Sequence, residues 1–234
     1  MRTSRSQGGF TLIEMIVVLA VIGMLVALIT PRIFPYVDEA KLIKAQADVN
    51  MIAAGITKFY KDTGRWPFEK DGDPPGTYTS GTDAAVLTSN SDCTGTAMSA
   101  AVSPCDPNAP TDNSTGTSWA LVTALGDSLH NQLVYNKPFG DNAAGEDPYP
   151  MSGKRAWNGP YLFNIATIDP WGQSYLVNIA SADPSLEGAT TQEWVIAISA
   201  GPDGELDTAT GEVWTSPAVG EVVPEDDDII AVIK

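Results

Sequence analysis

One apolar run close to the N-terminus constrains this chain more than any other feature. Residues 10–29 read FTLIEMIVVLAVIGMLVALI and contain one charged side chain, Glu14. As an α-helix with a rise of about 1.5 Å per residue, this run spans the hydrocarbon core of a bilayer, which is about 30 Å thick. The preceding segment MRTSRSQGG carries Arg2 and Arg5 and no acid. Because positively charged flanks stay in the cytoplasm, we expect a single-pass protein with a cytoplasmic N-terminus and a translocated C-terminal part.

The start of the apolar run carries a second signal. An ordinary secretory signal has a shorter apolar region that ends in a small-residue cleavage site. Here a short basic leader is followed by Gly9, Phe10, Glu14 and Pro31. This arrangement resembles the class III signal of type IV prepilins and type II secretion pseudopilins, and is closest to the major pseudopilin of the general secretion pathway protein G type. The resemblance implies that a prepilin peptidase removes residues 1–9 at the bacterial inner membrane and that Phe10 is then N-methylated.

Glu14 can also be interpreted from physical chemistry alone. Placing a carboxylate in hydrocarbon costs several kcal/mol of free energy. An ionisable residue inside a membrane span therefore indicates a functional role, in which another group pairs with it. The resemblance implies that this partner is the Phe10 amine of a neighbouring subunit, which would set the register of a filament. The alternative is a local role, because the helix dipole favours an acid in the first turn and the side chain can reach the interface.

The apolar run is expected to continue into an amphipathic helix that ends near residue 64. Pro31 and Pro35 each remove an amide donor, so we expect a kink or loosening between residues 27 and 35. After them, apolar side chains recur at spacings of three and four and predict one buried stripe. Its members are Leu42, Ala45, Val49, Ile52, Ile56 and Phe59. Gly64 is a typical helix stop, and Trp66 is expected to cover the core.

The remainder, residues 65–234, is predicted to form a periplasmic or extracellular globular domain. Residues 69–116 are rich in Gly, Pro, Ser, Thr, Asp and Asn and predict long loops, within an insertion of about residues 69–153. Within this insertion, leucines every fourth residue predict a helix over residues 118–135, and a second loop follows over residues 136–153.

The C-terminal part predicts a sheet. The segment AWNGPYLFNIATIDPWGQSYLV resembles the corresponding segment of major pseudopilins, and its Asp169-Pro170-Trp171-Gly172 is expected to form a turn. Strands are predicted at about residues 174–179, 193–199 and 229–233. The expected fold is therefore α+β and pilin-like: a long N-terminal helix, over residues 10–64 with residues 10–30 in the membrane, packed on a C-terminal antiparallel sheet with long loop insertions.

An acidic region near the C-terminus suggests a structural Ca²⁺ site. Carboxylates with nearby carbonyls and a hydroxyl are the hard oxygen ligands that Ca²⁺ prefers. The spacing is not that of an EF-hand. The pattern is similar to the calcium-binding loop of major pseudopilins and maps onto Ser199, Asp203 and Asp228, with Asp226 and Asp207 as weaker candidates. The alternative is a set of solvated surface acids that bind nothing.

Charge and cysteines narrow the possible partners and compartment. The net charge is −16, from 13 Lys and Arg against 29 Asp and Glu, and excludes a nucleic acid as the expected partner. The two cysteines, Cys93 and Cys105, lie in a polar stretch, where a disulfide is plausible in an oxidising compartment; two free thiols are the alternative.

These features predict a structural subunit and no enzyme. The expected partners are further copies of the chain, other pilins or pseudopilins, the prepilin peptidase and the inner-membrane assembly platform. The filament would be periplasmic or extracellular. The alternatives are a minor or tip pilin that binds a surface or a secreted cargo through its inserted loops, and a membrane-tethered enzyme. Against the enzyme, His130 is the only histidine and has no evident triad or metal partner in the sequence.

Overall fold

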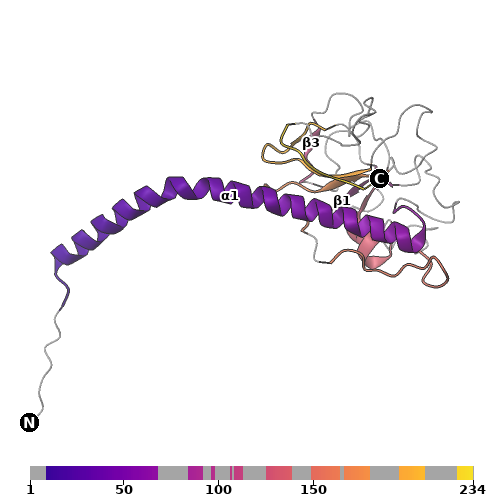
Figure 1. Cartoon of the computed structure of the whole chain (residues 1–234), viewed down its shortest axis with the longest axis horizontal. Coiled ribbons are helices and arrows are strands. Elements are labelled where there is room, and N and C mark those ends of the chain that lie inside the picture. The colour runs from indigo at the N-terminus through magenta and orange to yellow at the C-terminus, as the bar shows by residue number, and fades with distance from the viewer. Residues whose placement is uncertain are drawn as a thin grey trace, which may run out of the picture. The chain divides into compact units, whose positions relative to one another are not determined.

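The computed structural model divides the chain into two compact units, residues Met1–Lys41 and Leu42–Lys234. Figure 1 shows the elements of both units along the chain. The structure describes ten stretches: residues 9–67, 84–91, 96–97, 106, 108–112, 125–138, 149–163, 166–179, 195–208 and 226–233. Cys93 and Cys105 lie outside these residues, so their pairing stays a prediction.

The first unit contains the apolar half of helix α1 (Leu12–Thr63). Among the described residues, the stretch Leu12–Thr30 is the one long and apolar enough to cross a membrane, and none of it is buried within the chain. The helix continues through Pro31 and Pro35. The loosening expected there therefore does not end the helix. The Thr30 hydroxyl donates a hydrogen bond to the Val26 carbonyl (2.7 Å), a back-bond that slightly bends helices.

In the second unit, the predicted apolar stripe of α1 forms one side of the core. Five of its six members are fully buried, and Leu42, at the start of the unit, is 44% exposed. Phe59 makes edge-to-face contacts with Tyr149 (4.9 Å between centroids) and Tyr161 (5.4 Å). Burial of a large apolar side chain such as Phe59 contributes about 1.5–3 kcal/mol to the stability of the fold. Gly64, at φ 68°, then ends the helix by donating its amide to the Tyr60 carbonyl, as predicted.

The stripe packs on a mixed sheet whose strands follow the order β2-β4-β1-β5-β6-β8. The strands are β1 (Ala84–Thr88), β2 (Thr96–Ala97), β4 (Leu125–Ser128), β5 (Leu176–Asn178), β6 (Ile196–Ser199) and β8 (Ile229–Val232). A separate parallel ladder joins β3 (Thr111–Asp112) to β7 (Glu205–Leu206). The α+β pilin-like architecture is confirmed, as are the three predicted C-terminal strands, β5, β6 and β8, which pair antiparallel.

Two expectations for the middle of the chain are corrected. The sheet is not wholly antiparallel, because β1 pairs parallel with β4. The helix predicted over residues 118–135 is wrong at Leu125–Ser128, which is β4; a π-helical turn, η2 (Asn131–Tyr135), comes only after it. Gly126 and Asp127 are poor helix formers, and pairing with β1 outweighs the periodicity of the leucines. The segment expected to be loop thus supplies β1, an interior strand of the sheet.

A buried carboxylate holds the predicted turn before β5. Asp169 Oδ1 accepts hydrogen bonds from the amides of Trp171 (2.9 Å), Gly172 (2.8 Å) and Gln173 (2.9 Å). Gly172 has φ 101°, a conformation that favours glycine. The turn is therefore confirmed. Trp171 is partly buried against the core.

Candidate functional site

The first candidate region is the start of α1, where Thr11 and Glu14 form a capping box. The Thr11 amide and hydroxyl both donate to Glu14 Oε2, at 2.8 and 2.7 Å. In return, the Glu14 amide donates to the Thr11 hydroxyl oxygen (3.3 Å). This reciprocal pattern satisfies amides at the helix start that would otherwise lack acceptors. Glu14 therefore has a partner inside its own chain.

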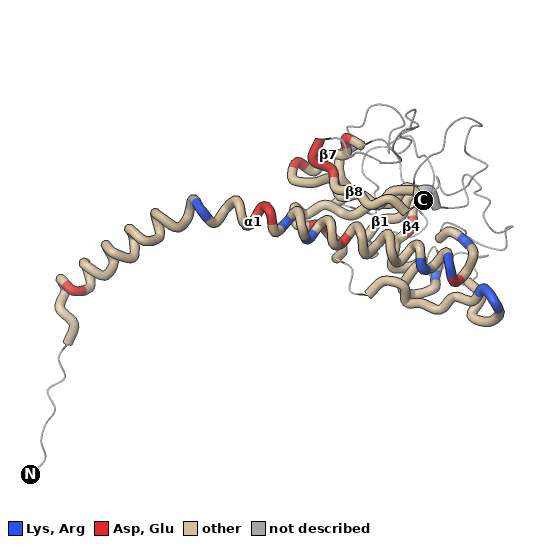
Figure 2. Tube along the Cα trace, viewed as in Figure 1, with Lys and Arg blue, Asp and Glu red and all other residues tan. Residues whose placement is uncertain are grey.

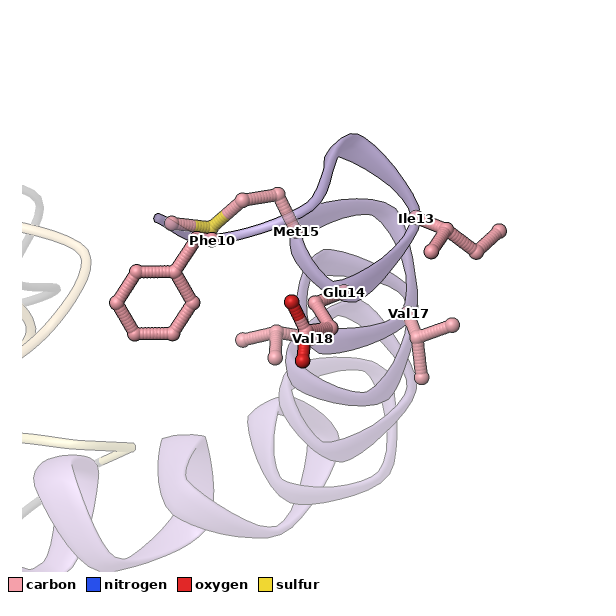
Figure 3. Close-up of a pocket in the computed structure, with 6 residues that line it drawn as sticks. All are labelled: Phe10, Ile13, Glu14, Met15, Val17 and Val18. Atoms are coloured by element: carbon pink, nitrogen blue, oxygen red, sulfur yellow. The ribbon is translucent and has the colours of Figure 1, made fainter. Parts of the chain in front are cut away.

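Glu14 nevertheless lies on an exposed surface beside Phe10. Phe10 is 83% exposed and, with Glu14 and Val18, lines an open hollow at the start of the helix. Figure 3 shows the Glu14 carboxylate, Val18 and the Phe10 ring on one side of the helix, while Ile13 and Val17 lie on the other. Ile13, Met15 and Val17 also line the hollow. The carboxylate is thus available to a second molecule that approaches this side.

Sequence reasoning missed the role of Thr11. A Thr three residues before a Glu at the start of an apolar run is the sequence pattern of a capping box, and Thr11-Leu12-Ile13-Glu14 has it. The consequence is practical. Removing the Glu14 side chain would disturb the helix start as well as the charge, so only a substitution that preserves the cap can test the charge.

The second candidate region is formed by the loops around β6, β7 and β8. Asp203 lies in the turn after β6, Asp207 directly after β7 and Asp226 in the turn before β8. One carboxylate oxygen from each lies within 4.8 Å of the others. Since Ca²⁺ binds oxygen at about 2.3–2.6 Å, oxygens on opposite sides of one ion are separated by nearly this distance. The structure thus brings together Asp203 with both of the weaker predicted candidates.

Gly201 allows these loops to approach each other closely. It has φ 68°, and a Cβ at this position would lie 2.4 Å from the carbonyl oxygen of Asp227. Any larger residue would therefore force the β6 turn away from the turn before β8. The convergence of the acidic side chains depends on this contact between the two turns.

Asp227 and Asp228, which follow Asp226 in the chain, lie close to other acids and are partly removed from solvent. Asp228 is 4% exposed, and its Oδ2 accepts the amides of Asp207 (3.0 Å) and Thr208 (2.7 Å). Burial raises the pKa of Asp228 to about 6, and raises the pKa of Asp227 as well, helped by the nearby Asp203 carboxylate. Among the described residues, Asp227 Oδ1 and Asp228 Oδ1 are buried oxygens without a hydrogen-bond partner.

Ser199, the hydroxyl in the predicted ligand set, lies in a different network. It is fully buried, and its hydroxyl donates to Asp169 Oδ2 (2.6 Å). This bond ties β6 to the turn before β5. The calcium ligand set therefore stays a prediction: the carboxylates of Asp203, Asp207 and Asp226 converge, whereas Ser199 and Asp228 make other bonds in the chain.

Comparison with known proteins places the N-terminal region in a family context. The family described as "Prokaryotic N-terminal methylation motif" matches residues 4–30. The type II secretion system core protein G of Pseudomonas aeruginosa is 38% identical over 68 residues, which is 29% of this chain and 48% of that protein. The type II secretion system core protein G of Klebsiella michiganensis is 31% identical over 68 residues, which is again 29% of this chain and 48% of that protein.

Pilins match as well. The type IV major pilin protein PilE1 of Neisseria gonorrhoeae is 34% identical over 61 residues, or 26% of this chain and 37% of the pilin. The matched part of the chain spans about half the length of these relatives or less. No solved structure matches the chain. The N-terminal region of this chain is homologous to type II secretion pseudopilins and type IV pilins, and it carries their methylation motif.

Proposed function

We propose that this chain is a structural subunit of a pilus-like filament, in which the subunits pack together through their N-terminal helices. The observation that supports this most directly is the fully exposed apolar surface of Leu12–Thr30, with Glu14 as its one charge. Such a surface requires a bilayer or other apolar helices to cover it. The similarity to secretion core protein G and to pilins favours both environments, one after the other. The membrane would cover this surface before assembly, and neighbouring subunits would cover it afterwards.

The apolar surface of α1 extends beyond the membrane span. Phe34 is 63% exposed, Tyr36 72% and Ile43 64%. These side chains lie past the 19 residues that could cross the hydrocarbon core of a bilayer. Packing against the same helix of further subunits would cover them, which supports polymerisation through the helix and a second copy of the chain as the main partner.

Processing and location follow from the same region. Cleavage between Gly9 and Phe10 by a prepilin peptidase would create an amine beside the exposed Glu14 carboxylate. We propose that this carboxylate pairs with the Phe10 amine of a neighbour, and that an inner-membrane assembly platform extracts the subunit into a periplasmic or extracellular filament. The relatives include subunits of a secretion system and of pili, so either filament fits.

Sheared filaments from cells that produce the chain test this proposal. Electron microscopy should show filaments, and mass spectrometry of their subunits should find an N-terminus at methylated Phe10. A chain that retains residues 1–9 in the membrane and in any filament would contradict the proposal. Correct processing with only traces of the chain in filaments would instead favour a minor or tip subunit.

We further propose that Asp203, Asp207 and Asp226 hold a structural Ca²⁺ ion. Three converging carboxylates and two unpartnered buried oxygens nearby form a region of concentrated negative charge. The three residues offer hard oxygen ligands to a divalent cation, which would stabilise the contact between the two turns.

Calcium is expected to raise the thermal stability of the full-length chain in detergent. At a Ca²⁺ concentration about 100 times the Kd, the gain is about 2.7 kcal/mol, or roughly 5–10 °C in Tm for a domain of this size. Asp207→Asn with Asp226→Asn should abolish the shift, whereas the neighbouring control Glu205→Gln should retain it. Differential scanning calorimetry with and without a chelator measures this. An equal shift in the double variant would contradict the assignment.

A further inference from the structure

Among the described residues of the second unit, one group of acids and one group of bases lie at different ends. In Figure 2, acidic residues gather around β7 and basic residues around the C-terminal end of α1. The acidic end consists of the exposed or half-buried residues Asp203, Glu205, Asp207, Asp226 and Asp227, with Asp228 buried beneath them. The basic end consists of the exposed residues Lys58, Lys61, Lys154 and Arg155, and the half-buried Asp62 lies in the same last turn of α1. In a chain with more than twice as many acids as bases, the concentration of bases at one end requires an explanation.

Contacts along α1 fix the distance between the two ends. The Gln46 side chain donates to the Ile230 carbonyl (3.2 Å), which places the start of β8, directly after the acidic turn, beside Gln46. At the other end, the Arg155 guanidinium lies against Gly64, directly after the last turn of the helix. From Gln46 to Thr63 the helix rises about 25 Å. The acidic and basic ends are therefore separated along the helix axis by about 25 Å.

The basic end carries four bases against one acid within the described part of the chain. Lys58, Lys61, Lys154 and Arg155 are exposed and form no ion pair there, whereas Lys44 pairs with Asp48 at 2.8 Å farther along the helix. Lys58 instead lies over the Tyr161 ring, 5.7 Å from its centroid. Unpaired charges of one sign at one end form a surface that attracts a partner of the opposite charge.

We propose that the basic end of one subunit packs against the acidic end of the next subunit along the filament. This inference rests on the proposed function, because subunits that all leave one membrane share one orientation of α1. With parallel orientation, the C-terminal end of one α1 faces the end of the next domain that lies beside Gln46, and opposite charges meet. The partner surface is therefore a second copy of this chain, selected by charge complementarity.

A charge-swap experiment on the full-length chain tests the contact. Lys61→Glu with Lys154→Glu should reduce the subunit recovered in sheared filaments at least tenfold, and Glu205→Lys with Asp227→Lys should do the same. The chain with all four substitutions should recover to within about threefold of the wild type, since the charges are reversed but still complementary. Lys61→Arg with Lys154→Arg, which keeps the charges, is the matched control and should assemble normally.

The outcomes separate the contact from the proposed function. Wild-type levels of filament from Lys61→Glu with Lys154→Glu would overturn the contact and leave the filament function intact. Loss of filaments that the four-substitution chain does not restore would also overturn it, and would indicate a different anionic partner. Absence of filaments from the wild type would contradict the function itself. Thermal melts check folding; if Asp227→Lys unfolds the domain, the single pair Lys61→Glu and Glu205→Lys repeats the swap.

Discussion

Cells that produce the Glu14→Gln variant are expected to yield at least tenfold less subunit in sheared filaments than cells that produce the wild type. A glutamine at this position can still accept the Thr11 amide and hydroxyl, so the capping box is preserved. What disappears is the negative charge that would pair with the Phe10 amine of a neighbour. A hydrogen bond between charged groups contributes about 1.5–3 kcal/mol, and 1.4 kcal/mol corresponds to a tenfold change in an equilibrium constant.

The matched control is Thr11→Val, which removes the capping hydroxyl and keeps the charge. It is expected to weaken the helix start by about 0.5–2 kcal/mol while filaments still form. Subunit amounts are normalised to the processed chain in the membrane, so that a defect in cleavage is not counted as a defect in assembly. If Thr11→Val abolishes filaments and Glu14→Gln does not, Glu14 serves the helix start and the proposed pairing is wrong.

The parts of the fold that sequence predicted well are those encoded by local periodicity. The α1 stripe from Ala45 to Phe59 repeats at spacings of three and four, and every member of it is buried. Apolar C-terminal segments predicted β6 and β8 for the same kind of reason. Gly64 ended the helix because an αL residue there is favourable mainly for glycine.

The parts that failed depend on partners distant in the chain. Strand β1 has four apolar residues and one Thr inside a long polar region, and its central place arises from pairing with β4 on one side and β5 on the other. Asp106 is similar: it is fully buried and accepts hydrogen bonds from Thr88, Asn90 and Ser174. The sequence suggests a solvated residue for an Asp in a polar loop, and only the folded contacts show that Asp106 bonds to the sheet and to the turn before β5.

The same limit applies to the candidate calcium site. A motif aligned by spacing selects Ser199 and Asp228, but the structure engages Ser199 Oγ with Asp169 and Asp228 Oδ2 with two backbone amides. Asp203, which the motif also selects, instead converges with Asp207 and Asp226, where Gly201 allows two turns to touch. The calcium site therefore stays a prediction, and the choice among its acids depends on how the loops fold.

Asp169→Ala is expected to be the most destabilising single substitution in this part of the domain, at about 3–5 kcal/mol of unfolding free energy. Asp169 is 4% exposed and accepts three backbone amides on Oδ1 and the Ser199 hydroxyl on Oδ2. Alanine would leave four donors without this acceptor in the region where the turn meets β6. Hydrogen bonds to charged groups contribute about 1.5–3 kcal/mol each, and orphaned buried donors cost about 1–3 kcal/mol.

Two milder variants separate the turn from the bond to β6. Ser199→Ala removes the hydrogen bond to Asp169 and a longer one from the Gly201 amide (3.4 Å), and should cost about 1–2 kcal/mol. Asp169→Asn can keep the three amide bonds and should also cost about 1–2 kcal/mol. Urea unfolding of the full-length chain in detergent, followed by tryptophan fluorescence, measures all three variants. A loss below about 1 kcal/mol for Asp169→Ala would show that packing of Trp171, and not the carboxylate, holds the turn. A large loss would instead show that the turn and β6 form one cooperative unit, which is the scaffold that positions the acidic end of the subunit.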